Sequence, residues 1–191
     1  MATITGTQKI DLQQYYAMGE QGLLGDRRVE LIDGEMIDQP MQGTPHAISL
    51  ELVRATLSLL FGPQFWVRMQ LPLDFAPFSC PEPDVAVVLG TPRSYVGQPH
   101  PSTALLAVEV SETTLNMDRH RKASLYAAAG IQDYWIVNLE DHQLEIYRDP
   151  IPDATADFGH SYATSVILQP GDLASPLAMP NRQVAVNNLL P

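Results

Sequence analysis

Two short, almost uninterrupted apolar runs constrain the fold of this chain more than any other feature. They are Asp84-Val-Ala-Val-Val and Leu105-Leu-Ala-Val-Glu-Val, and neither alternates apolar with polar residues as a strand with one wet face would. Continuous runs of this kind are typical of strands that are covered on both faces. The sequence therefore predicts an α/β fold in which a β-sheet lies between layers of helices.

The remaining elements are indicated by shorter signals. Asp33-Gly34 stands between two apolar runs and predicts a two-residue hairpin, because a type I′ turn needs positive φ at both positions. Apolar spacing and the terminators Gly62-Pro63 and Gly130 indicate helices. We expect helices over 8–20, 44–61 and 118–129, and further strands over 66–73, 133–138, 143–148, 162–168 and 183–186. Since no repeat or low-complexity linker interrupts the chain, we expect one domain over residues 1–191.

Each of the two apolar runs carries a carboxylate, Asp84 in the first and Glu109 in the second. An acid in an apolar strand is costly unless a partner offsets its desolvation. A shared Mg²⁺ ion would be such a partner, because it takes one or two carboxylates together with waters and substrate phosphate. Lys122, on the helix that follows, would add a point charge beside the metal. These are the minimal parts of a metal-dependent phosphodiester nuclease.

Each of these residues also has an explanation that needs no catalysis. Asp84 could open a strand after Pro83 and accept turn hydrogen bonds, and Glu109 could form a salt bridge with an arginine. Asp118 lies four residues before Lys122, which lies four before Tyr126, so the three share one helix face. Asp118 could still be an ordinary acid that complements the positive end of the helix dipole.

Charge argues against a simple nucleic-acid binder. Eleven basic residues against 22 acidic ones give a net charge of −11, whereas nucleic-acid-binding proteins usually carry a basic patch. A nuclease of this composition would need a local basic site, a partner, or a metal that neutralises its acids. Arg119-His120-Arg121-Lys122 is the one dense basic stretch, and we expect Arg119 and Arg121 to point outward, where they could touch phosphate.

Other chemistries find little support. The single cysteine, Cys80, excludes an internal disulfide and is expected to be a passive thiol. The lack of disulfides, the polar start over residues 1–8 and the absence of a long apolar run together favour a cytoplasmic protein without a membrane segment. Ser111 lacks the Gly-x-Ser-x-Gly context of a serine hydrolase. Paired ligand spacing for zinc is missing around His100, His120, His142 and His160.

Several blocks between residues 10 and 150 carry a resemblance to a known family. They are Arg28-Val-Glu-Leu-Ile-Asp-Gly-Glu, His46 at a helix start, Gln70-Leu-Pro-Leu, Pro83-Asp84-Val-Ala-Val-Val, and the long block that runs from Val108-Glu-Val-Ser-Glu-Thr-Thr-Leu through Lys122 to Tyr126-Ala-Ala-Ala-Gly-Ile-Gln-Asp-Tyr-Trp-Ile-Val-Asn. In these blocks the chain resembles the Uma2 family, also described as DUF820. That family is abundant in cyanobacteria and belongs to the PD-(D/E)XK restriction-endonuclease-like superfamily.

The resemblance implies a mixed β-sheet core flanked by helices, with extra β-hairpins, and a metal site that uses Mg²⁺ or Mn²⁺. It places Asp84 and Glu109 as metal ligands, with the Val110 carbonyl as a third. The superfamily usually has a lysine two residues after the second acid. That position is Ser111 here, so the standard motif is broken, and Lys122 would supply the lysine from the following helix.

The resemblance also implies supporting residues. Glu30 matches an acid that serves as an outer metal ligand or water-holder, although it could instead be an exposed hairpin residue. Gln70 would line the same cleft. Independently of the resemblance, Tyr126 shares the helix face of Lys122 and would offer its hydroxyl as a donor. His46 is a further supporting residue, unless it merely bonds backbone or solvent at a helix start.

The sequence therefore predicts a metal-dependent endonuclease with DNA as substrate. The alternative is the same fold kept as an inactive module for DNA or protein interaction, which the acidic charge favours. A different enzyme built on a metal–carboxylate site is a third possibility, with no substrate indicated. We also expect a homodimer, because the apolar, proline-punctuated segment 162–191 could cover a sheet edge or join that of a partner.

Overall fold

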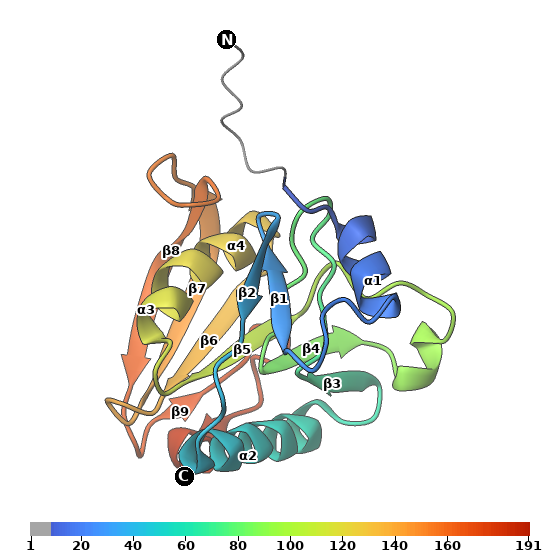
Figure 1. Ribbon diagram of the computed structural model, residues 1–191. Helices are drawn as coiled ribbons and strands as arrows, with labels where there is room; N and C mark the ends of the chain where they lie inside the picture. The colour runs from blue at the N-terminus through green and yellow to red at the C-terminus, as the bar shows by residue number, and fades with distance from the viewer. Residues whose placement is uncertain (1–8) are drawn as a thin grey trace.

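A six-stranded sheet forms the centre of the molecule (Figure 1). The computed structural model describes residues 9–191. Neighbouring strands in the sheet are antiparallel except for β5 and β6, so the sheet is mixed, as expected from the family resemblance. In spatial order the strands are β3 (Phe65–Met69), β4 (Val85–Leu89), β5 (Leu106–Ser111), β6 (Asp133–Asn138), β7 (Gln143–Pro152) and β8 (His160–Leu168).

The two apolar runs are central strands covered on both faces. One face packs against α2 (Thr44–Phe61), whose Val53 and Leu57 are buried against Val85 and Val108. The same layer contains the end of the chain, with β9 (Leu173–Ala174), β10 (Val184–Ala185) and the 3₁₀ turn η3 (Val186–Asn188). The opposite face is covered by a helix composed of α3 (Leu115–Met117), the π-helical segment η2 (Asp118–Lys122) and α4 (Ala123–Ala128). Burial on both sides explains why these strands do not alternate.

A hairpin and a short helix pack beside this sandwich. The hairpin has β1 (Val29–Ile32) and β2 (Glu35–Asp38), and both Asp33 and Gly34 have positive φ, as predicted for a type I′ turn. The helix is α1 (Leu12–Glu20), and its Tyr15 packs against Leu31. Asp11 caps this helix, so the helix begins later than the expected residue 8. Residue 8 and the rest of the polar start over 1–8 lie outside the described residues.

Several boundaries differ from the sequence expectation. The helix expected over 118–129 begins three residues earlier, at Leu115, and becomes π-helical at Asp118. The strand expected over 66–73 ends at Met69, because Gln70 has positive φ and turns the chain. On α2, Leu59 points to solvent with 85% of its surface exposed although its spacing is helical.

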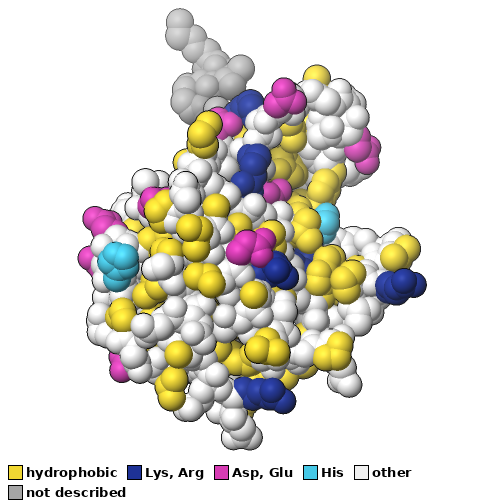
Figure 2. Space-filling model, turned by 90° about the horizontal axis from the view of Figure 1, so that it is seen from below, with side chains coloured by type: hydrophobic (Ala, Val, Ile, Leu, Met, Phe, Trp, Pro, Cys, Tyr) yellow, Lys and Arg dark blue, Asp and Glu magenta, His cyan; other side chains and the backbone are white. Residues whose placement is uncertain are grey.

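The surface around α2 carries scattered apolar side chains and few charges. Ile48 is 46% exposed and lies near the start of that helix. Viewed from this side, the lysine and arginine side chains lie apart from one another and form no broad basic patch (Figure 2). None of the helices within residues 9–191 is both long and apolar enough to cross a bilayer.

Candidate active site

Asp84 and Glu109 lie opposite each other on the antiparallel strands β4 and β5. Val85 pairs with Val108, so the same register sets Asp84 across from Glu109 and directs both side chains to the face covered by α3, η2 and α4. The Asp84 backbone N–H donates to Glu109 Oε2 at 3.4 Å. The Val110 N–H donates to Asp84 Oδ2 at 2.9 Å. The two acids singled out in the sequence therefore lie together.

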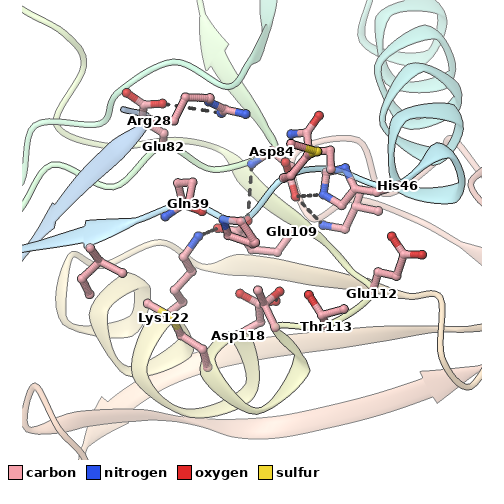
Figure 3. A pocket seen from close by; sticks show the side chains of 18 of the residues that line it. Arg28, Gln39, His46, Glu82, Asp84, Glu109, Glu112, Thr113, Asp118 and Lys122 are labelled. Carbon is pink, nitrogen blue, oxygen red and sulfur yellow. Dashed lines mark hydrogen bonds and ion pairs between the residues drawn. The ribbon is translucent and has the colours of Figure 1, made fainter. Parts of the chain in front are cut away.

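Lys122 reaches this pair from η2. Its Nζ donates to Glu109 Oε1 at 3.1 Å, and the hydroxyl of Tyr126 donates to the same oxygen at 2.6 Å. Figure 3 shows Lys122 pointing from its helix toward Glu109. The helix thus brings an ammonium to the second acid, although Ser111 stands where the common motif has its lysine.

Glu30 holds Lys122 from the other side. Its Oε1 accepts from Lys122 Nζ at 3.2 Å and from the Glu82 backbone N–H at 3.1 Å, and its Oε2 has no hydrogen-bond partner among the described residues. Glu30 is only 1% exposed, so the alternative of an exposed hairpin residue is wrong. The next residue of β1, Leu31, is fully buried in a separate cluster with Tyr15 and Cys80.

Asp84 is held by two residues that the family resemblance had implied. His46, in the first turn of α2, contacts Asp84 Oδ2 through Nε2 at 3.1 Å. Gln70 donates from Nε2 to Asp84 Oδ1 at 3.1 Å, and its positive φ brings the side chain into this position. His46 therefore does more than bond backbone or solvent at a helix start.

A cleft of about 190 Å³ opens over the acids. Sequence reasoning missed much of its lining. Asp118 is 2% exposed and accepts a hydrogen bond from the Thr114 hydroxyl at 2.6 Å, so it is not an ordinary helix-start acid. Glu112 lies against Gly43, where a Cβ would come within 2.7 Å of its Oε2. The position of Glu112 directly after the second acid strand was the available signal. Arg28, Gln39, Glu82 and Thr113 are the other lining residues that are labelled in Figure 3.

The two arginines that were expected to face outward form ion pairs with glutamates. Arg119 forms a two-point contact with Glu145 at 2.9 and 2.5 Å, and Arg121 contacts Glu35 at 2.7 Å. Both side chains are about one-third exposed, but their guanidinium groups are directed to carboxylates of β7 and β2. A phosphate group would have to compete with these carboxylates.

Comparison with known proteins identifies the family. The sequence model of Uma2, described as "Putative restriction endonuclease", matches residues 12–187. The chain belongs to the Uma2 family. A crystal structure described as a "putative nuclease belonging to DUF820" from Anabaena variabilis ATCC 29413 has the same fold, with a TM-score of 0.68 at 14% sequence identity. The superposition covers 94% of this chain and 97% of that one. Among curated proteins, no sequence matches this chain.

The ionisation of this Uma2 site separates Asp84 from its neighbours. Burial raises the pKa of Asp84, but the hydrogen bond and charge of His46 outweigh it, so the pKa lies below its ordinary value. Burial lowers the pKa of His46, yet Asp84 outweighs that effect and raises it. Both shifts favour an imidazolium–carboxylate pair.

The group around Lys122 behaves differently. Burial alone would lower the pKa of Lys122, but Glu109 and Glu30 raise it well above its ordinary value, so the ammonium stays charged. Burial raises the pKa of Glu109 well above its ordinary value, and raises that of Glu30, because Lys122 only partly counteracts it. These two carboxyls share one ammonium, so they hold a proton more strongly than free carboxylic acids do.

The donor set fits a hard divalent cation. Asp84, Glu109, Glu30 and Asp118 are four acids around two cationic side chains, Lys122 and His46, so a bound cation would relieve an excess of negative charge. Within residues 9–191, no three His, Cys, Asp or Glu side chains are grouped so that they could hold a metal ion. Two carboxylates still suit Mg²⁺, because it usually keeps several waters. Asp84 and Glu109, with the Val110 carbonyl, are the residues of this Uma2 chain that could hold it.

Proposed function

We propose that this chain is an endonuclease that hydrolyses phosphodiester bonds in DNA with Mg²⁺ or Mn²⁺. The observation that carries the proposal is the cross-strand pair of Asp84 and Glu109, with the Lys122 ammonium 3.1 Å from the second acid. Asp84 and Glu109 would hold the metal together with the Val110 carbonyl. A bound metal of this kind lowers the pKa of its water and neutralises charge on the phosphate.

The side chains around the two metal ligands would have separate roles in catalysis. Lys122 would orient the attacking water or stabilise negative charge that develops on the phosphate. Glu30 and Tyr126 fix this arrangement, since Glu30 holds the ammonium and Tyr126 holds the Glu109 carboxyl. His46 and Gln70 orient Asp84, each through one oxygen of its carboxylate.

Weak binding of DNA follows from the charge of the cleft. Glu82 and Glu112 line it, while the charge of Asp38 is balanced by its ion pair with Arg27. Arg28 is the exposed cation of the cleft and lies 3.8 Å from Glu82. A phosphate would meet negative potential there unless a divalent cation is bound first. We therefore propose that metal binding precedes DNA binding, and that the protein works at low ionic strength or with a partner.

A nicking assay on supercoiled plasmid tests the proposal. The wild type is compared in Mg²⁺, in Mn²⁺ and with chelator, beside Asp84→Asn, Lys122→Met and the cleft control Asp38→Asn. Loss of a group that stabilises the transition state costs about 10²–10³-fold in rate, so both site variants should fall by at least that much. Asp38→Asn should keep wild-type activity, because Asp38 is paired with the exposed Arg27. Equal nicking by the wild type and both site variants would refute the assignment.

The second candidate is an inactive module for DNA or protein interaction. It is favoured by the acidic cleft and by the direct contacts of Lys122 with two glutamates. Calorimetric titration with Mg²⁺ separates the two candidates in part. A nuclease should bind Mg²⁺ with at least millimolar affinity and lose that binding in Asp84→Asn, whereas a purely structural module has no need of the ion.

Three further proposals concern the whole chain. We propose one domain over residues 1–191, a cytoplasmic location, and a homodimer. Size-exclusion chromatography with light scattering tests the last of these. A monomeric mass across the concentrations used in the nicking assay would overturn it.

A further inference from the structure

Arg68 is a buried cation without a carboxylate partner. It lies on β3, is only 1% exposed, and forms no ion pair within the described part of the chain. Its Nε and Nη1 atoms are buried and lack any hydrogen-bond acceptor there. A charged group in this situation is expensive, because it has lost its contact with water and has no directly bonded carboxylate.

The groups that surround Arg68 do not neutralise it. Its Nη2 contacts Nδ1 of His100 at 3.0 Å, and the face of Trp66 lies 4.9 Å from its Cζ. Burial, together with the charge of Arg68, lowers the pKa of His100, so this imidazole accepts a hydrogen bond as a neutral group. Asp74, the nearby acid, receives the hydroxyl hydrogen bond of Tyr16 at 2.5 Å instead. Asp74 favours the charged form of Arg68 only from a distance, so the guanidinium has no directly bonded carboxylate among the described residues.

A second cavity opens onto this arginine. It has a volume of about 160 Å³, and none of its lining residues belongs to the candidate active site. Apart from Arg68, His100 and Gln98, its walls are aromatic or apolar: Trp66, Pro92, Tyr95, Val96, Pro99 and Pro101. The outer wall is the exposed loop after β4, which includes the 3₁₀ turn η1 (Pro92–Tyr95) and lies at the right of Figure 1. The cavity is thus apolar at its sides and cationic at its floor.

We propose that this cavity binds a small organic oxyanion, a carboxylate or a phosphate monoester with an apolar or aromatic body. The oxyanion would accept hydrogen bonds from Arg68, whose planar guanidinium suits both groups. The body would lie against the wall formed by Trp66 and Tyr95, whose rings contact each other with centroids 5.4 Å apart and inclined at 53°. The volume suits one aromatic ring, since a cavity of about 150 Å³ holds benzene. This site is independent of the proposed nuclease function.

Fluorescence titration of the full chain tests the proposal. Of the two tryptophans, Trp66 touches Arg68, whereas Trp135 is fully buried in the opposite core. Benzoate and phenyl phosphate are the probes. Two compounds serve as controls: inorganic phosphate, which lacks the apolar body, and benzamide, which is the neutral analogue of benzoate. We expect saturable changes in emission and a higher melting temperature with benzoate or phenyl phosphate, weaker effects with inorganic phosphate, and none with benzamide.

Variants separate this site from a structural role of Arg68. Arg68→Met should weaken benzoate binding by at least about tenfold, while its melting temperature without ligand stays equal to or above that of the wild type. The control Arg93→Met removes an exposed arginine of the same loop that does not line the cavity, and should bind as the wild type does. If Arg68→Met fails to fold, Arg68→Lys replaces it in the test. Lysine keeps the positive charge but lacks the planar guanidinium, so this variant should bind benzoate at least about tenfold more weakly than the wild type does.

Three results would overturn the proposal: no saturable binding by the wild type, unchanged affinity in the Arg68 variants, or equal binding of benzamide and benzoate. Equal binding of benzamide and benzoate would show that the cavity recognises only the apolar body. Asp84→Asn, which removes a proposed metal ligand, should keep the affinity for benzoate, so failure of the nuclease proposal leaves this test intact.

Discussion

Replacing Lys122 by methionine should reveal how strongly the buried charge cluster depends on its ammonium. The lysine side chain is 6% exposed and those of Glu30 and Glu109 are 2% and 4% exposed. Removing one partner of a buried ion pair costs about 3–5 kcal/mol, because it leaves an uncompensated buried charge. We expect a loss of that size in the free energy of unfolding for Lys122→Met at pH 8.

The loss should shrink at lower pH. Burial already raises the folded-state pKa of Glu30 and Glu109, and removing the ammonium raises both further. A carboxyl whose pKa is raised in the folded state contributes stability below its unfolded pKa and loses it as pH rises through the folded value. Each additional proton held by the folded state changes the unfolding free energy by about 1.4 kcal/mol per pH unit. The variant should therefore approach the wild type between pH 8 and pH 5.

Urea denaturation of wild type and variant at pH 5, 6, 7 and 8 measures this. Lys9→Met is the matched control, since Lys9 is the chain's other lysine and pairs with Asp33 while 49% exposed. An exposed pair contributes about 0–1 kcal/mol. If Lys122→Met is as stable as Lys9→Met and equally insensitive to pH, the buried cluster does not have the electrostatic role argued here.

Three further predictions concern the scaffold. Leu57→Ala removes a fully buried side chain of α2 and should lower the unfolding free energy by about 2–5 kcal/mol, whereas Leu59→Ala, 85% exposed on the same helix, should change it by less than about 0.5 kcal/mol in urea denaturation. Despite burial, hydrogen bonds from Arg119 and its neighbours lower the pKa of Glu145 to about 2, so the wild type should lose stability as pH falls from 4.5 toward 2, while Glu145→Gln should show a flatter acid-unfolding curve by circular dichroism. Tyr126→Phe removes the hydroxyl that holds Glu109 and should cost about 1–3 kcal/mol; a melting temperature equal to that of the wild type would show that this bond is dispensable.

The sheet and the helices that pack on it were predictable, because the sequence patterns that indicate them are local. Continuous apolar strands, the Asp33-Gly34 turn and the helix terminators each depend on a few adjacent residues. The position of Lys122 was predictable in part, because the family resemblance indicated a lysine from the following helix. Its contact with Glu30 depends on how the β1–β2 hairpin docks, which no short pattern encodes.

Other features depend on contacts between distant segments. Asp118 looked like a helix-start acid, because nothing in the sequence indicates that the helix begins earlier and continues with a π-helical turn. Arg119 looked free to bind phosphate, but Glu145 lies 26 residues further along the chain and contacts it from β7, beneath the helix. Arg68 gave no signal, since its burial depends on the loop after β4.

The π-helical turn has a consequence for how three polar side chains share one side of a helix. In a regular α-helix, residues eight positions apart are turned by roughly 80° from one another about the axis, because each residue adds about 100°. The Ala123 N–H donates to the Asp118 carbonyl, five residues back, so one residue is added to the turn. This reduces the offset between Asp118 and Tyr126 to roughly 20°. Deleting one residue at 119–121 would leave a regular helix in which Asp118 and Tyr126 are seven positions apart, again roughly 20° from alignment, so Asp118 should stay on the side of the helix that faces the cleft.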